Sequence, residues 1–196
     1  MVAVRAATTS DLDGVAEALG RAFHDDPVML YILPRVAKQT KQMKALFRSE
    51  MKRALEKGAV FTTGDGPAAG GAIWVEPGKW KLGGLELLTQ VPVLLSFGRD
   101  TPRSLSVLSK MEKVHPKEPH WYLAILGTEP AAQGKGIGSG LMQPILDKCD
   151  GEGLPAYLES SKEANIPFYR RHGFEVTGTV EIPDGPTLWP MWRDPR

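Results

Sequence analysis

The stretch Gln133-Gly134-Lys135-Gly136-Ile137-Gly138 stands between an apolar run, residues 121–126, and a helical pattern that begins near Ser139. A strand that leads into a glycine-rich turn, and then directly into a helix, points several backbone N–H groups at one spot. The positive end of the helix dipole points at the same spot. This arrangement suits a phosphate group, so the stretch predicts a phosphate-binding loop at the centre of the fold.

The spacing of the glycines narrows the kind of loop. A Walker P-loop needs a glycine five positions before its Gly-Lys pair and Ser or Thr after the pair, but Glu129 and Gly136 hold those places. A dinucleotide-binding fingerprint needs G-x-G-x-x-G; Gly134 and Gly136 fit it, whereas Ser139 stands at the third glycine. The first alternative fails, and the second is weakened but stays open, as does a plain turn that joins strand to helix.

Composition and charge point to a small-molecule partner. The chain has 196 residues, with 24 Lys and Arg against 23 Asp and Glu and a formal net charge of +1. This is the length of a single domain, and the balanced charge gives no general attraction for nucleic acid or an anionic membrane. The longest apolar runs are far shorter than the roughly 20 residues of a membrane span. We expect one domain over residues 1–196, a monomer or homodimer, with neither nucleic acid nor a membrane as partner.

The single cysteine, Cys149, cannot form an internal disulfide, and the first residues do not resemble a secretory leader. Both observations favour a cytoplasmic location. Cys149 continues the apolar stripe of the helix that follows the loop, so we expect it in the core rather than as a nucleophile. No covalent acyl-enzyme is therefore expected.

Hydrophobic periodicity predicts strands and helices along the whole chain. The expected strands are residues 2–6, 59–63, 71–75, 121–126, 156–159, 176–182 and 188–192. The expected helices are residues 12–23 after a cap at 9–11, 43–55, 139–152 and a short one within 165–174. Pro144 interrupts the third helix and predicts a bend there. Together these elements predict a mixed α/β sheet with helices on both faces.

Two further segments are expected near an acceptor site. Residues 77–119 contain two apolar-periodic patches, 82–95 and 105–114, which predict helices that cover a cleft. The turn at 24–27 contains Asp25 and Asp26. We expect one of them to cap the next helix in a solvated turn; a carboxylate held over a site is the less favoured alternative.

A second motif follows the loop by some thirty residues: Asn165-x-x-Phe168-Tyr169-x-x-x-Gly173-Phe174. This motif, together with Gln-x-x-Gly-x-Gly after an apolar strand and Pro130, is similar to the two signatures of the GNAT superfamily of acetyl-CoA-dependent N-acetyltransferases. Further segments resemble puromycin N-acetyltransferase-like members of that superfamily, namely residues 115–119, 133–139, 155–161 and 181–186 and the proline at 144. The resemblance is strong over the C-terminal 80 residues or so and holds only in outline before them.

The resemblance implies a fold and a set of cofactor contacts. It implies a mixed, mostly antiparallel central sheet with a V-shaped splay between its two central strands, and acetyl-CoA as acetyl donor, without a metal. Pantetheine would lie in the splay against backbone groups, and Thr128 departs from the usual Val there without affecting the backbone role. The implied cofactor residues are Leu126, Gly127 and Thr128 for pantetheine, Gln133, Gly134, Lys135, Gly136, Ile137, Gly138 and Ser139 for pyrophosphate, and Asn165 and Tyr169.

Acetyl transfer to an amine needs a base for the amine and an acid for the departing thiolate. The resemblance implies that Tyr169 is the acid, although a buried tyrosine also serves as core. Glu159, at the end of a strand beside the splay, is the first candidate base; an ion pair at a strand end is an equal alternative. Glu118 and His120 are weaker candidates.

The expected acceptor is the amine of a small molecule, including antibiotic-like or aminonucleoside amines. Two alternatives stay open: a non-catalytic acyl-CoA-binding or sensing module, and an N-acetyltransferase that acts on proteins.

Overall fold

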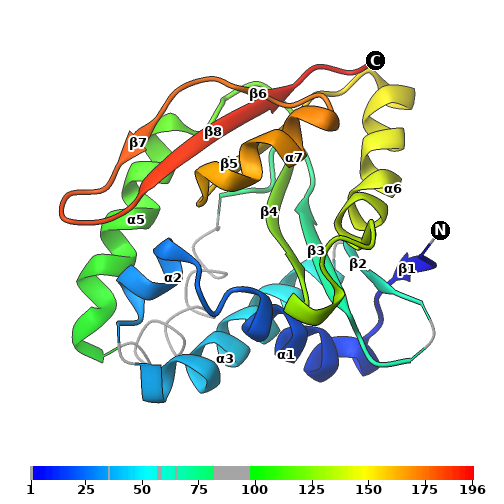
Figure 1. Ribbon diagram of the computed structural model, residues 1–196. Coiled ribbons are helices and arrows are strands. Elements are labelled where there is room, and N and C mark those ends of the chain that lie inside the picture. The colour runs from blue at the N-terminus through cyan, green and yellow to red at the C-terminus, as the bar shows by residue number, and fades with distance from the viewer. Residues whose placement is uncertain (1, 35, 57–58, 65, 82–97) are drawn as a thin grey trace.

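The computed structural model of the chain describes residues 2–34, 36–56, 59–64, 66–81 and 98–196 (Figure 1). One mixed sheet runs in the order β1-β2-β3-β4-β5-β8-β6, and β7 pairs with β8. The strands are β1 (Val4–Ala6), β2 (Val60–Thr63), β3 (Gly70–Val75), β4 (Trp121–Thr128), β5 (Ala156–Ser160), β6 (Glu175–Val176), β7 (Val180–Glu181) and β8 (Thr187–Arg193). The helices are α1 (Leu12–Ala22), α2 (Pro27–Ile32), α3 (Val36–Leu55), α5 (Thr101–Val114), α6 (Ile137–Glu152) and α7 (Ile166–Arg171).

The two central strands, β4 and β5, separate soon after they meet. They are parallel and pair only at Trp121 with Ala156 and at Tyr122 with Tyr157. Beyond Tyr122, β4 continues along β3, whereas β5 continues along β8. The facing edges of β4 and β5 therefore diverge and leave backbone groups without a strand partner. The remaining strand pairs are antiparallel, which confirms the predicted mostly antiparallel sheet with a V-shaped splay.

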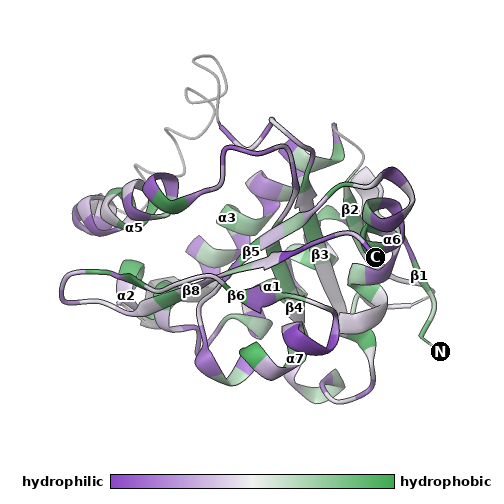
Figure 2. Cartoon of the chain, turned by 90° about the horizontal axis from the view of Figure 1, so that it is seen from above, coloured by the Kyte–Doolittle hydropathy of each residue, from purple (hydrophilic) through white to green (hydrophobic). Residues whose placement is uncertain are grey.

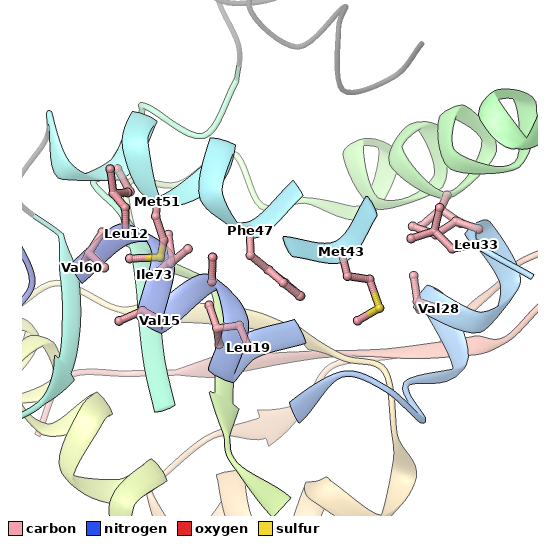
Figure 3. Packing of buried hydrophobic residues seen from close by; sticks show 14 of the residues in the cluster. Leu12, Val15, Leu19, Val28, Leu33, Met43, Phe47, Met51, Val60 and Ile73 are labelled. Carbon is pink, nitrogen blue, oxygen red and sulfur yellow. The ribbon is translucent and has the colours of Figure 1, made fainter. Parts of the chain in front are cut away.

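Each face of the sheet has its own core. On one face α1 and α3 pack against the sheet around Leu19, Phe47 and Ile73 (Figure 3). On the other face α6 and α7 pack around Leu141 and Phe174. Figure 2 shows the largely hydrophobic strands β3 and β4 enclosed between these helices. The prediction of helices on both faces is confirmed.

A β-bulge lies in β4 where that strand begins to leave β5. Trp74 of β3 pairs with Leu123, and the next residue, Ile73, pairs with Ile125, so Ala124 has no partner in the ladder. Leu123 and Ile125 would share a face in a regular strand. Instead Leu123 packs in the α6 and α7 core, and Ile125 packs against the α1 and α3 core. A bulge bends the strand that carries it. The bend at Ala124 therefore lies where β4 begins to separate from β5.

Most predicted elements are present, with shifted ends. α6 begins at Ile137, two residues before the predicted start, because Gly136 already caps it. The residues predicted as the cap of the first helix, 9–11, form a 3-10 turn that is itself capped by Thr8, and Asp11 is the N-cap residue of α1. α5 contains the predicted patch at 105–114, whereas the patch at 82–95 lies outside the described residues. Within the described ranges, no helix has both the length and the apolar character that crossing a membrane requires.

Candidate active site

A cavity of about 630 Å³ occupies the splay. Its lining comes from the ends of β4 and β5, the loop that leads into α6, the turn between α1 and α2, and α7. The structure brings almost every predicted site residue to this one cavity: Leu126, Gly127, Thr128, Gln133, Gly134, Gly136, Ile137, Gly138, Ser139, Glu159, Asn165 and Tyr169. Lys135 is the exception, because its Nζ donates to the backbone oxygen of Ala131 at 3.1 Å, away from the lining.

The loop before α6 has the backbone shape of an anion cradle. Gly134 and Gly136 have φ angles of +74° and +77°, a left-handed conformation that favours glycine. A Cβ built on either residue has no atom within 4 Å, so both face open space. Gly136 caps α6 without any side chain, and the first N–H groups of a helix have no acceptor within the helix. These residues therefore fit a pyrophosphate group.

A side chain at Gly138 would meet α7 rather than open space. A Cβ at this position would lie 3.2 Å from the ring of Phe168, which is tighter than an ordinary contact. The side chain of Phe168 comes from α7, so Gly138 lets the start of α6 pack closely against α7. This contact joins the two motifs that stand some thirty residues apart in the sequence.

A serine and a histidine that the sequence does not connect meet at the loop. Ser139 Oγ lies 2.9 Å from His172 Nε2. Burial lowers the pKa of His172, and the nearby Arg171 and Arg193 lower it further, which keeps the ring neutral. Ser139 is in the first turn of α6, so its hydroxyl is held at the cradle. Arg171 also lines the cavity, and no motif in the sequence indicates it.

Tyr169 presents its phenol to the cavity. Its ring is 9% exposed and packs edge-on against Phe168 and Phe174. In the part of the chain that the structure describes, no residue makes a hydrogen bond to the Tyr169 hydroxyl. Burial raises the pKa of Tyr169 above its usual range, and the negative charge of Asp26 adds to the rise. The hydroxyl therefore keeps its proton at neutral pH.

Asp26 both caps a helix and lines the cavity. Its Oδ1 accepts hydrogen bonds from the backbone N–H groups of Val28 (3.0 Å) and Met29 (2.9 Å), at the start of α2. Its Oδ2 accepts a hydrogen bond from Ser161 Oγ. Burial is the main influence on the Asp26 carboxyl and raises its pKa. The favoured prediction of a cap is therefore right: His24 and Asp25 of the turn are exposed, whereas the capping residue Asp26 is buried and lines the cavity.

Glu159 is an enclosed carboxylate at the point of the splay. Its side chain is 1% exposed, the residue is part of the cavity lining, and its Oε1 has no hydrogen-bond partner among the described residues. The nearest cation-forming group is His115, whose Nδ1 lies 3.6 Å from that oxygen. Burial raises the pKa values of Tyr122 and Tyr157, and the nearby Glu159 raises them further.

The weaker candidates for a base lie elsewhere. Neither Glu118 nor His120 lines the cavity. Glu118 is exposed, and His120 is buried behind Glu159, in contact with His115. Cys149 is completely buried, and burial raises the pKa of its thiol to about 12, which confirms it as a core residue.

Comparison with known proteins gives a consistent result. Residues 99–174 match the model of the acetyltransferase (GNAT) family. An uncharacterised N-acetyltransferase of Schizosaccharomyces pombe is 31% identical over 201 residues, which span 92% of this chain and 77% of that protein.

Solved structures agree with these sequence matches. A structure from Corynebacterium glutamicum, described as a histone acetyltransferase and related acetyltransferase, is 26% identical, with a TM-score of 0.74 over 100% of this chain and 98% of that one. A PaiA N-acetyltransferase from Thermoplasma acidophilum, solved in complex with coenzyme A, is 13% identical and shares the fold, with a TM-score of 0.60 and coverage of 99% of each chain.

Proposed function

The chain belongs to the GNAT family of acetyltransferases, and from this premise we propose that it transfers the acetyl group of acetyl-CoA directly to the amine of a small molecule. One observation carries the choice of an amine. Glu159 is a buried carboxylate with no hydrogen-bond partner at Oε1 among the described residues, in the same cavity as the glycine cradle and Tyr169. An enclosed anion of this kind attracts a cationic ammonium group and takes up its proton.

The cradle and the strand edge would hold the donor. The N–H groups at the start of α6, with Gln133 and Ser139 beside them, would bind the pyrophosphate, and the free edge of β4 at residues 126–128 would bind the pantetheine arm as a neighbouring strand would. Asn165 lines the same cavity and would contact the arm. When bound, acetyl-CoA supplies an acetyl group that its thioester activates. The Thr128 carbonyl already accepts a hydrogen bond from Gln133 Nε2 at 3.3 Å, so Leu126 and Gly127 would carry most of the backbone contacts.

Glu159 would remove the proton that blocks the acceptor. A primary alkylamine has a pKa near 10, as lysine does, so it arrives as an ammonium ion at neutral pH. Glu159 Oε1 would take one of its protons and leave a neutral nitrogen. Asp26 adds negative potential on the acceptor side of the cavity, whereas Asp25 is already paired with Lys162 at 2.6 Å.

Tyr169 would return a proton on the other side of the reaction. Its raised pKa keeps the phenol protonated, so Tyr169 Oη would donate to the sulfur that leaves. A backbone N–H of β4 would stabilise the oxygen of the reacting carbonyl. A covalent intermediate on Cys149 is not part of the proposal, because that thiol is buried with a pKa near 12.

The acceptor class has a first and a second candidate. Residues 115–119, 155–161 and 181–186 resemble puromycin N-acetyltransferase-like members, which favours an antibiotic-like or aminonucleoside amine. The C. glutamicum neighbour is described as a histone acetyltransferase and related acetyltransferase, which favours a lysine side chain as the second candidate. Both acceptors present an amine to the same carboxylate.

The test combines binding and turnover in one preparation. Acetyl-CoA, ATP and NAD are compared for thermal stabilisation, since a ligand that binds only the native state raises its stability. Thiol release is then followed with puromycin, simple arylalkylamines, polyamines and a lysine-containing peptide. We expect stabilisation by acetyl-CoA alone and thiol release with one of the small amines. Release only with the peptide would select the second candidate, and acetyl-CoA binding without release for any amine would contradict the proposal.

A further inference from the structure

Two histidines stand in a row behind Glu159, on the side away from the cavity. His115 follows α5 and His120 precedes β4. His115 Nδ1 is 3.6 Å from Glu159 Oε1, and His115 Nε2 is 3.0 Å from His120 Nε2. His120 Nδ1 is in turn 2.6 Å from the backbone oxygen of Glu118. A continuous line of polar atoms therefore runs from Glu159 through both rings to a backbone carbonyl.

The backbone carbonyl of Glu118 determines which ring nitrogens of His120 and His115 carry hydrogen. A backbone oxygen only accepts, so His120 Nδ1 carries the hydrogen. Burial lowers the pKa of His120 and keeps it neutral, so its Nε2 has a lone pair and accepts from His115 Nε2. With its hydrogen on Nε2, a neutral His115 turns the lone pair of Nδ1 toward Glu159.

The surroundings keep water away from this contact. The side chains of His115 and Glu159 are 3% and 1% exposed. Trp80 stacks on the His115 ring with centroids 3.7 Å apart, and the rings of Tyr122 and Tyr157 lie edge-on to it at 4.8 and 4.9 Å.

Several titratable groups surround the contact between His115 and Glu159. They are His120 before β4, Tyr122 on β4 and Tyr157 on β5, and Glu50 on α3 acts on Tyr122 while it is paired with Arg53. The two phenols stay neutral because burial raises their pKa values. Glu159 and His115 are therefore left to exchange a proton with each other.

We propose that Glu159 and His115 act as one base, in which a single proton from the acceptor amine is shared between Oε1 and Nδ1, and that His120 is the residue that positions His115 for this. The inference rests on the proposed function. An N–H bond of the ammonium breaks and an O–H bond forms at Glu159; transfer of the same proton to His115 leaves a carboxylate beside an imidazolium. Charge and protons balance in both forms.

A carboxylate alone is much less basic than the amine whose proton it must remove. An ordinary glutamate has a pKa near 4.3 and is a weak base for an amine with a pKa near 10. Two acceptors that face each other without a hydrogen between them are unfavourable in a buried site, and a proton held between Oε1 and Nδ1 removes that conflict.

The first test needs neither acetyl-CoA nor an acceptor. Protein labelled with ¹⁵N-histidine is titrated by NMR as wild type and as Glu159→Gln. We expect His120 in the Nδ1–H form and His115 in the Nε2–H form, and a changed His115 Nδ1 resonance in Glu159→Gln. A His115 ring with its hydrogen on Nδ1, or an identical Nδ1 resonance in both proteins, would overturn the inference.

The second test separates a chemical role from a packing role. His115→Gln keeps a donor directed at His120 but has no atom that can be protonated next to Glu159. We expect kcat to be reduced about tenfold across the kcat/KM profile, with an unchanged Kd for acetyl-CoA. His115→Asn should show the same loss, and His120→Asn a smaller one.

A wild-type profile in His115→Gln, in an enzyme that acetylates amines, would refute the shared proton while the proposed function stands. Failure of the wild type to acetylate any amine would instead refute the proposed function, and the NMR result would still decide the arrangement of the protons.

Discussion

The two ends of the cavity are built in opposite ways. The phosphate cradle consists of backbone groups from one contiguous stretch, shaped by Gly134 and Gly136 and completed by the start of α6. The proposed base consists of side chains from separate segments, with Glu159 on β5 and His115 after α5, behind the lining. A backbone site depends on spacing along the chain, so it leaves a readable motif. A side-chain site depends on the tertiary fold and leaves none.

The difference should also appear in function. In the proposed function the cradle would interact with a part of the donor that does not react, so changes there should alter binding. Glu159 and Tyr169 would act on atoms that exchange protons, so changes there should alter kcat with little effect on donor binding. Each of the following substitutions tests this division.

The largest effect is expected for Glu159→Gln. The amide has nearly the same shape but cannot take up a proton, so kcat should fall by about 10² to 10⁴. The Kd for acetyl-CoA, measured by titration calorimetry, should stay within about twofold of wild type. Glu163→Gln, on an exposed turn outside the cavity lining, is the matched control and should behave as wild type. A kcat within a factor of about three of wild type would remove Glu159 from the chemistry.

Gly136→Asp should abolish tight donor binding. Its φ of +77° strains any side chain, and a carboxylate at the start of α6 would repel the pyrophosphate. We expect Kd for acetyl-CoA to rise about 100-fold or more, which is about 2.7 kcal/mol. Gly178→Asp, where a Cβ has open space and φ is unremarkable, is the control. Tight binding by Gly136→Asp would show that the pyrophosphate lies elsewhere.

Tyr169→Phe should have a smaller effect on kcat. A thiolate leaves fairly easily without help, so we expect a decrease of about 10- to 100-fold, with donor binding preserved. Because the pKa of Tyr169 is raised, the wild-type enzyme should show no loss of activity from this residue below about pH 10. Tyr31→Phe, whose hydroxyl donates to the Pro183 carbonyl outside the cavity, is the control. Full turnover by Tyr169→Phe would exclude it as the acid.

The smallest effect is expected at Cys149. With a pKa of about 12, its thiolate fraction at pH 8 is on the order of 10⁻⁴, and burial slows access further. Thiol reagents should modify the folded protein slowly and the protein in guanidinium rapidly, and Cys149→Ala should retain wild-type kcat. Rapid modification of the native protein, or a large loss of kcat in the variant, would contradict the assignment of Cys149 to the core.

The sequence predicts one end of the cavity far better than the other, for physical reasons. Glycines at fixed intervals between an apolar strand and a helix have few interpretations, so the residues at 133–139 could be located in advance. His115 could be recognised only as part of a similar segment, because its contact with Glu159 is created by the packing of α5 and β5. Asp26 could be assigned a cap or a site residue, but not both, until its burial was known.

Strand boundaries illustrate the same limit at the level of the backbone. Residues 121–126 are apolar throughout, so the sequence has no alternation from which a bulge at Ala124 could be detected. The predicted strand was right, and the change of face within it could not be seen. The start of α6 was predicted two residues late because glycine, a poor helix former, occupies its first turn.

The unpaired Ala124 contributes to the splay between β4 and β5 but is not required for the pairing of β4 with β3. Every neighbour of Ala124 in β4 already has a partner in β3, so a chain that lacked it could pair both strands without interruption and keep each side chain on its present face. Such a chain would retain both cores and lose the bend that parts β4 from β5. Deletion of this residue is therefore expected to close the splay while the two cores stay in place.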